Sequence, residues 1–370
     1  MSSRILRSVI ALGMAALACA PAAAPPAASP TGASGAGASA GPAASVAALP
    51  EPAASAAAPA VAPSPIKLNA SFSSRSGNST GLYVAMERGY FAEQGLDVDL
   101  TFASSITAGQ AMAANSIPIG LVGSEGFDLN LEHGGPFTRY VAGVTTRFVY
   151  KIVGRPELGG MADLRGKILG VTRQGSVSDY AGRKALLRYG LTADTDVSMA
   201  YLGSTDASVA SVVAGHVDAI TAAPPTDRRA LQQGMKLLVD LEPLNMPFWM
   251  AGILVRSDYA QDNPDAVERF LKGYLHGIAT ALNDPEIAMD ALAKYLELDD
   301  RDLLRHTYDT YRPTWSRDQL VPEDAVLATL QESPKPAART ADPRDFYDNS
   351  FLERIKASGY LDSLYASPRP

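Results

Sequence analysis

The hydrophobic pattern separates a leader of small residues from a long region in which short apolar runs alternate with segments of helical spacing. Short apolar runs bounded by turn residues are typical of buried strands. Strands are predicted at residues 66–73, 96–100, 117–122, 138–145, 168–172, 197–202, 217–222, 236–241 and 248–256. Helices are predicted after a cap at Asn78 or Ser79 and at residues 107–114, 125–133, 176–189, 207–214, 226–233, 264–283, 285–296, 299–311 and 322–332. This alternation predicts an α/β fold with mainly parallel sheets flanked by helices.

The length of this region predicts two lobes. The roughly 300 residues from 66 to 365 exceed the size at which a single core keeps growing. The long apolar strand at 248–256 is expected to cross back toward the first lobe. We therefore expect lobe 1 at residues 66–146, lobe 2 at 147–250, and the completion of lobe 1 with C-terminal helices at 251–365. A cleft between the lobes is the expected ligand site.

The first residues have the pattern of a secretory signal. Arg4 and Arg7 precede an uncharged apolar run at 9–17 and small residues before Cys19. The run is too short to span a membrane, which takes about 20 apolar residues. The segment before Cys19 resembles a bacterial lipobox, although Ala16 stands where Leu is usual. Residues 1–19 are thus predicted to be a signal with lipidation of Cys19, and ordinary cleavage near residues 20–24 is the alternative.

Residues 20–65 are almost entirely Ala, Pro, Ser and Gly. Such a segment has too little apolar bulk to offset the entropy of ordering, and its prolines favour an extended, solvated backbone. It is predicted to be a disordered tether between a membrane anchor and the folded domain. The expected location is the periplasm or the outer face of the cytoplasmic membrane.

Charge and composition exclude several classes of function. The net charge of −7 and the pI near 5.2 give no footprint for nucleic acid and would repel an anion at long range, so an anion site must be built locally. The single cysteine rules out an internal disulfide or a cysteine metal site. The four histidines fall on different predicted elements without metal-ligand spacing, and no hydrolase or phosphate-loop motif is present. We expect no metal, no cofactor and no catalysis.

Several segments resemble one protein family. Residues 81–98 (GLYVAMERGYFAEQGLDV) are similar to the opening of solute-binding proteins for sulfonates, taurine, nitrate and thiamine precursors. Residues 164–167 (LRGK) followed by Gly175-Ser176, residues 214–219 (AGHVDA) and residues 348–352 (DNSFL) are weaker matches to the same family. The resemblance spans about residues 66–360. It implies a two-lobed, type II periplasmic-binding architecture.

The resemblance also implies a function. Its members capture a small solute and pass it to the permease subunits of an ABC importer, so we expect a monomeric, membrane-anchored receptor with no nucleic-acid partner. A sulfonate, nitrate, a pyrimidine precursor or an aromatic carboxylate are all open as solutes. One alternative is an enzyme of thiamine-precursor synthesis on the same fold, but the cysteine-rich iron motif of that branch is missing here. A ligand-sensing receptor subunit is the other alternative.

Candidate ligand-binding residues lie where strands end and helices begin, because helix N-termini present free N–H groups and partial positive charge. The first two loops offer Ser73, Ser74, Asn78, Gly123 and Ser124. The third, which the resemblance also marks, offers Gln174, Gly175, Ser176 and Val177. In each loop a plain turn or helix cap is the alternative interpretation.

Four further candidates lie near the expected crossings between the lobes. Thr145 and Arg147 lie at the first crossing, where the arginine could clamp a sulfonate or carboxylate through two hydrogen bonds. Pro224 is expected to shape the cleft. Trp249 could stack on a planar ligand, with a core position as its alternative.

Overall fold

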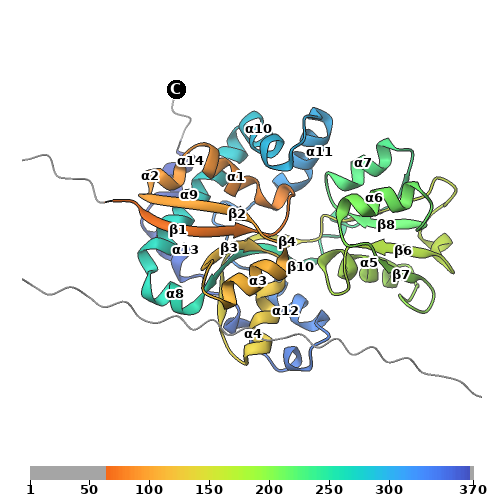
Figure 1. Cartoon of the computed structure of the whole chain (residues 1–370), viewed down its shortest axis with the longest axis horizontal. Coiled ribbons are helices and arrows are strands. Elements are labelled where there is room, and N and C mark those ends of the chain that lie inside the picture. Colours follow the sequence, from red (N-terminus) through yellow and green to blue (C-terminus); the bar gives the residue numbers. More distant parts are fainter. Residues whose placement is uncertain (1–63, 367–370) are drawn as a thin grey trace, which may run out of the picture. The chain divides into compact units, whose positions relative to one another are not determined.

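The structure, a computed structural model, describes residues 64–366 and contains two five-stranded sheets, each flanked by helices (Figure 1). The α/β, two-lobed fold predicted from the hydrophobic pattern is confirmed. The predicted signal at 1–19, Cys19 and nearly all of the predicted tether at 20–65 lie outside the described residues. No helix within residues 64–366 is both long and apolar enough to cross a bilayer.

The first sheet has the strand order β2-β1-β3-β10-β4. Its strands are β1 (Ile66–Phe72), β2 (Leu96–Phe102), β3 (Ile119–Val122), β4 (Thr138–Arg147) and β10 (Pro247–Arg256). Strand β1 is parallel to β2 and β3, whereas β10 is antiparallel to β3 and β4. Strand β3 is buried along its whole length, which explains its unbroken apolar sequence.

The second sheet repeats this order as β7-β6-β8-β5-β9. Its strands are β5 (Lys151–Gly154), β6 (Ile168–Val171), β7 (Ser198–Tyr201), β8 (Ala219–Ala222) and β9 (Lys236–Asp240). Strand β6 is parallel to β7 and β8, and β5 is antiparallel to β8 and β9. The hydrophobic pattern did not predict β5, because this short strand begins with a lysine.

The chain crosses between the sheets twice, at residues 148–150 after β4 and at 241–246 before β10. Strand β10 therefore returns to the first sheet, as the long apolar run at 248–256 predicted. The predicted lobe boundary at 250/251 falls inside this strand, since residues 247–250 already belong to β10. We propose that the lobes divide at the two crossings.

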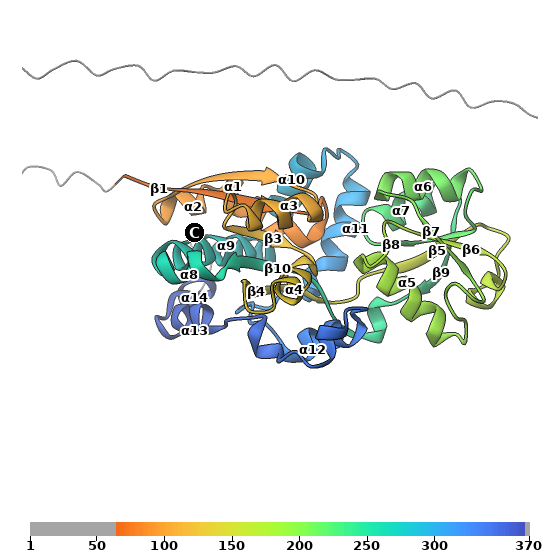
Figure 2. The same cartoon turned by 60° about the horizontal axis from the view of Figure 1, so that its bottom comes forward.

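Helices cover both faces of each sheet (Figures 1 and 2). The first lobe carries α1 (Thr80–Glu87), α2 (Tyr90–Glu93), α3 (Ser105–Ala113), α4 (Glu125–His133), α8 (Ser257–Asp262), α9 (Pro264–Asn283), α10 (Pro285–Leu296), α11 (Arg301–Tyr311), α12 (Glu323–Glu332), α13 (Ser350–Ala357) and α14 (Tyr360–Tyr365). The second lobe carries α5 (Val177–Arg188), α6 (Thr205–Val213) and α7 (Thr226–Gln232). Helices α13 and α14 were not predicted.

Local capping explains where several helices begin. Pro264 and Pro285 occupy the first turns of α9 and α10, where a missing N–H costs nothing. Asp284 accepts hydrogen bonds from the amides of Glu286 and Ile287 at 3.0 and 3.1 Å. Ser79, one of the two predicted caps, occupies the N-cap position of α1, but its side chain makes no capping hydrogen bond. A short 3₁₀ turn, η1 (Gly77–Ser79), precedes α1, and the Ser76 side chain accepts from the Asn78 amide at 3.4 Å.

Candidate ligand-binding site

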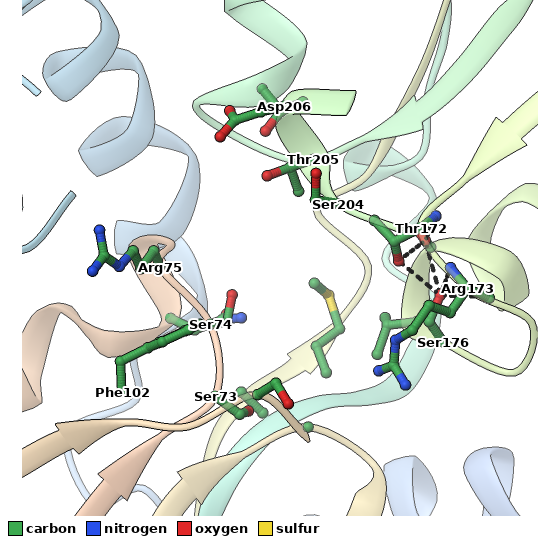
Figure 3. Close-up of a pocket in the computed structure, with 18 of the residues that line it drawn as sticks. Ser73, Ser74, Arg75, Phe102, Thr172, Arg173, Ser176, Ser204, Thr205 and Asp206 are labelled. Carbon is green, nitrogen blue, oxygen red and sulfur yellow. Dashed lines mark hydrogen bonds between the residues drawn. The ribbon is translucent and has the colours of Figure 1, made fainter. Parts of the chain in front are cut away.

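A cavity of about 650 Å³ lies where loops of both sheets meet (Figure 3). The loops that form it follow β1, β2 and β3 in the first sheet and β6, β7 and β8 in the second. These strands run parallel within each sheet, so their carboxyl ends share one edge, where ligands bind in open α/β folds. The first lobe contributes Ser73, Ser74, Arg75, Asn78, Phe102, Ser104, Gly123 and Glu125 among others, and the second contributes Thr172, Arg173, Ser176, Val177, Ser178, Gly203, Ser204, Thr205, Asp206, Pro225, Thr226 and Arg229.

The loop after β1 is held by backbone and hydroxyl contacts. The Ser73 amide donates to the Leu121 carbonyl at 3.0 Å. The Ser74 carbonyl accepts from the hydroxyls of Ser79 at 3.2 Å and Tyr83 at 3.3 Å. Burial raises the pKa of the Tyr83 hydroxyl, so it stays a neutral donor. These contacts fix the backbone of Ser73 and Ser74 at the cavity wall.

Asn78 and Glu125 bring unsatisfied acceptors to the same wall. Asn78 is only 6% exposed, and its Oδ1 has no hydrogen-bond partner in the described part of the chain. The Glu125 carboxylate folds over Gly123, because a Cβ built on that glycine would lie 2.9 Å from Glu125 Oε2. That carboxylate oxygen is buried and also lacks a partner within residues 64–366.

Tyr140 positions the turn that carries Gly123 and Glu125. Its hydroxyl donates to the Gly123 carbonyl and accepts from the Gly126 amide at 3.1 Å. Complete burial, with the nearby Glu125 charge as a second cause, raises the pKa of this phenol well above its usual value. A buried neutral hydroxyl therefore joins the end of β3 to the first turn of α4.

The loop between β6 and α5 forms the opposite wall. The hydroxyls of Thr172, Ser176 and Ser178 hydrogen-bond to one another at 2.9 to 3.1 Å. Ser176 also donates to the Arg173 carbonyl at 2.7 Å. Ser176 occupies the N-cap position of α5, but its side chain makes no capping hydrogen bond to the helix.

Some charged side chains at the cavity form ion pairs within the described part of the chain, and others do not. Arg75 forms an ion pair with Glu297 at 2.7 Å, and Arg229 pairs with Asp206 at 3.1 Å. The Arg173 guanidinium has no hydrogen-bond or ion-pair partner among the residues that the structure describes. Figure 3 shows Ser73, Ser74, Arg75 and Phe102 on one side, facing Thr172, Arg173 and Ser176, with Ser204, Thr205 and Asp206 on a third side.

The cavity brings together six of the predicted site residues, one or more from each of the three predicted loops. These are Ser73, Ser74, Asn78, Gly123, Ser176 and Val177. The other predicted residues do not line it. They are Ser124, Thr145, Arg147, Gln174, Gly175, Pro224 and Trp249.

Specific contacts explain why the crossing residues lie elsewhere. Arg147 donates to the Asn245 carbonyl at 2.8 Å and lies 4.0 Å from Asp324, so it is not placed to clamp a ligand in the cavity. Thr145 is fully buried within β4, opposite Ala251 of β10.

Trp249 is fully buried and packs against Tyr140, with ring centroids 4.3 Å apart, which corresponds to its alternative interpretation as a core residue.

The remaining residues lie beside the cavity rather than in its wall. Ser124 occupies the turn between the lining residues Gly123 and Glu125. Gln174 is exposed, and Gly175, in the left-handed region at φ +72°, donates its amide to Asp179 at 2.9 Å. Pro224 is buried, and its neighbour Pro225 takes the place in the wall.

Several lining residues were not among the predicted set, notably Arg75, Phe102, Arg173 and the segment 203–206. Phe102 ends β2, and Ser204 caps α6 by accepting from the Ala207 amide at 3.2 Å. The rule that ligands meet strand ends, applied to these two loops as well, would have found them.

Two such lobes with a shared cavity at their strand ends define the class of two-lobed ligand-binding proteins. The chain belongs to the NMT1/THI5 like family, whose model matches residues 76–288. This confirms the family resemblance seen in the sequence. In the described part of the chain, no cluster of His, Cys, Asp and Glu is placed to hold a metal ion.

The chain is also similar to curated relatives and, in its fold, to solved structures. The chain is 27% identical over 252 residues to the riboflavin-binding protein RibY of Chloroflexus aurantiacus, covering 64% of this chain and 69% of the relative. It is 25% identical over 224 residues to a putative binding protein of Brucella abortus, covering 60% and 68%.

The fold is similar to that of the periplasmic aliphatic sulphonate binding protein SsuA of Escherichia coli, with TM-score 0.62, 21% identity and coverage of 75% of this chain and 87% of the other. It is also similar to the periplasmic nitrate-binding protein NrtA of Synechocystis, with TM-score 0.65, 14% identity and coverage of 82% and 92%. All four are named as binding proteins.

Proposed function

We propose that this protein is the extracytoplasmic solute-binding component of an ABC importer and captures a small organic solute in the cavity. The observation that carries the proposal is that both lobes supply the walls of one cavity. A ligand that contacts both walls binds the closed arrangement better than the open one, and so shifts the lobes toward closure. The names of the relatives and structural neighbours support the same function.

The composition of the walls supports binding rather than catalysis. No histidine, cysteine or lysine is among the residues that line the cavity. The Ser176 hydroxyl hydrogen-bonds to the hydroxyls of Thr172 and Ser178 and donates to the Arg173 carbonyl. None of these three partners is a general base that could activate the hydroxyl as a nucleophile.

We also propose how the protein is attached to the membrane. The signal at 1–19, lipidation at Cys19 and a tether over 20–65 would keep a monomeric receptor at the outer face of the membrane, within reach of the permease subunits. Replacing Cys19 with Ser should release the protein from the membrane fraction into the soluble fraction. An unchanged distribution would contradict the anchor and leave the binding function intact.

Lobe closure can be measured directly because Cys19 is the only cysteine. In a Cys19→Ser background, spin labels at Ser198→Cys and Lys356→Cys would report the distance between exposed positions on β7 and α13. The probes are riboflavin, ethanesulfonate, nitrate and pairs of aromatic or aliphatic anions with and without an amine. Calorimetry measures the affinity of each probe. We expect a bound compound to shift the distance distribution. An unchanged distribution with a compound bound would contradict the proposed function.

A further inference from the structure

The wall built by the first lobe presents acceptors that no protein group satisfies. Asn78 and Glu125 both line the cavity, and the buried Asn78 Oδ1 and Glu125 Oε2 behind its wall lack hydrogen-bond partners in the described part of the chain. Asn78 is more than nine-tenths buried, and the carboxylate of Glu125 is held over Gly123. Buried acceptors without partners are costly, so a wall of this kind favours a ligand that supplies donors.

The wall built by the second lobe presents donors instead. The guanidinium of Arg173 is unpaired within the described residues, whereas Arg75 and Arg229 are neutralised by Glu297 and Asp206. The first turns of α5 and α6 add backbone N–H groups and partial positive charge beside it. The two charges left free, on Glu125 and Arg173, thus belong to opposite walls.

We infer that the solute has two poles, a donor nitrogen that faces Glu125 and Asn78 and an anionic group that faces Arg173. This inference rests on the proposed function and names the chemistry of its ligand. An anion without a donor would leave the two acceptors unsatisfied and would be repelled by the Glu125 carboxylate. Glu125 is therefore the residue that discriminates between solutes, and Arg173 supplies attraction common to all anions.

Size and surface also favour an organic solute over a small inorganic ion. The volume of about 650 Å³ lies within the range of about 300–1,000 Å³ typical of pockets for organic ligands. The Phe102 ring lies at the cavity with 46% of its surface exposed and offers an apolar face. The middle of the solute is accordingly expected to be apolar.

Pairs of compounds that differ only in an amine test this polarity. Suitable pairs are sulfanilate with benzenesulfonate, 4-aminobenzoate with benzoate, and taurine with ethanesulfonate. Calorimetry on the native protein should show the amine member binding at least tenfold more tightly within each pair that binds. Glu125→Gln should remove this preference, while Arg173→Gln should weaken both members of a pair by the same factor.

A second pair of variants keeps the test decisive if one of the first variants fails to fold. Asn78→Leu removes an acceptor at similar volume and should reduce the amine preference in the same direction. Gly123→Ala should do so too, because the added methyl would displace the Glu125 carboxylate. Thermal melts of each variant identify any that fail to fold, and the remaining variants then decide the question.

The outcomes separate this inference from the proposed function. Equal affinity of amine and amine-free members, or a preference that survives Glu125→Gln, overturns the two-pole solute. So does the absence of binding by every pair when riboflavin or nitrate still closes the lobes. If no probe binds at all, the two-pole solute is rejected and the proposed function loses its support as well.

Discussion

At the scale of single residues, hydrogen bonds within the protein decide which groups of the cavity wall are free for a ligand. Arg75, Arg147 and Arg173 all lie in or beside the predicted polar loops. Arg75 is paired with Glu297, and Arg147 with the Asn245 carbonyl, so only Arg173 is free among these three. The partners lie 222 and 98 residues away in the sequence, and the local pattern therefore could not distinguish the three arginines.

Ser176 is a residue whose enlargement should affect binding alone. Its hydroxyl lines the cavity and forms part of the network with Thr172 and Ser178. Ser176→Leu places an apolar side chain in this wall and should weaken binding of any probe compound at least tenfold by calorimetry. The melting temperature should change little, because Ser176 is half-buried at a cavity rather than in a core.

The matched control is Ser198→Leu, at the exposed far end of β7. This change adds the same side chain to the same lobe and should leave affinity unaltered. Equal loss of affinity in both variants, or no loss in either, would remove Ser176 from the binding site.

At the scale of elements, close backbone packing joins α1 to α9. A Cβ added to Gly277 of α9 would lie 2.0 Å from the carbonyl oxygen of Gly81 in α1. Gly277→Ala therefore forces these helices apart and should destabilise the protein by about 1–3 kcal/mol in urea unfolding.

Gly109 of α3 is the control for helix propensity. A Cβ there would meet only Leu129, at 3.9 Å, an ordinary contact. Gly109→Ala should stabilise the protein slightly, by up to about 1 kcal/mol, because alanine favours the helix. Destabilisation of similar size in both variants would mean that the α1–α9 contact is not the cause.

A buried charge cluster joins α7 of the second lobe to α11 of the first. Asp227 is fully buried, 2.8 Å from His306 Nε2 and 3.6 Å from Lys151 Nζ. Asp227→Asn leaves these partners without their shared carboxylate and should lower the free energy of unfolding by about 3 kcal/mol. Chemical denaturation at neutral pH measures this loss.

A neighbouring exposed pair on the same two helices provides the comparison. Arg228 of α7 lies 3.0 Å from Asp302 of α11, and both side chains are largely exposed. Asp302→Asn should cost less than about 1 kcal/mol, because solvent screens such pairs. If both variants lose the same stability, burial of the Asp227 cluster is not what stabilises the contact.

The sequence predicted elements well where apolar periodicity was long and poorly where polar residues interrupt it. Strand β10 and helix α9 were found with bounds close to those observed. Strand β5 was missed, because Lys151 looks like a surface residue until its ion pairs with Asp227 and Asp240 are known. For Trp249 the sequence left two interpretations open, a ligand contact beside a predicted crossing and a core position. The structure places the side chain in the core.

At the scale of the whole molecule, net charge and local charge act differently. The net charge of −7 repels anions at long range, so a site for an anion must be built from local positive charge. In the structure the free Arg173 and the helix N-termini of the second lobe supply that local positive character. The position of Glu125 opposite this arginine depends on how β3 meets α4, where the glutamate begins the helix.

The raised pKa values of buried tyrosines predict that the folded protein loses stability at alkaline pH. Burial raises the pKa of Tyr180, Tyr295 and Tyr365 to about 12, and raises the pKa of the fully buried Tyr140 and Tyr274 well above the usual value near 10. The fold thus favours the neutral phenols. Their contribution to stability is complete below pH 10 and is lost as the pH rises from 10 through 12, because the unfolded chain ionises first.

Absorbance of tyrosinate and far-UV circular dichroism, followed together, measure this response. The tyrosines whose pKa is raised should ionise above pH 10, in step with unfolding. The same titration in concentrated urea is the control, in which all should ionise near pH 10. Complete ionisation near pH 10 with unchanged circular dichroism would show that these phenols are not held neutral by the packed lobes, because a buried phenolate without a partner is incompatible with the native core.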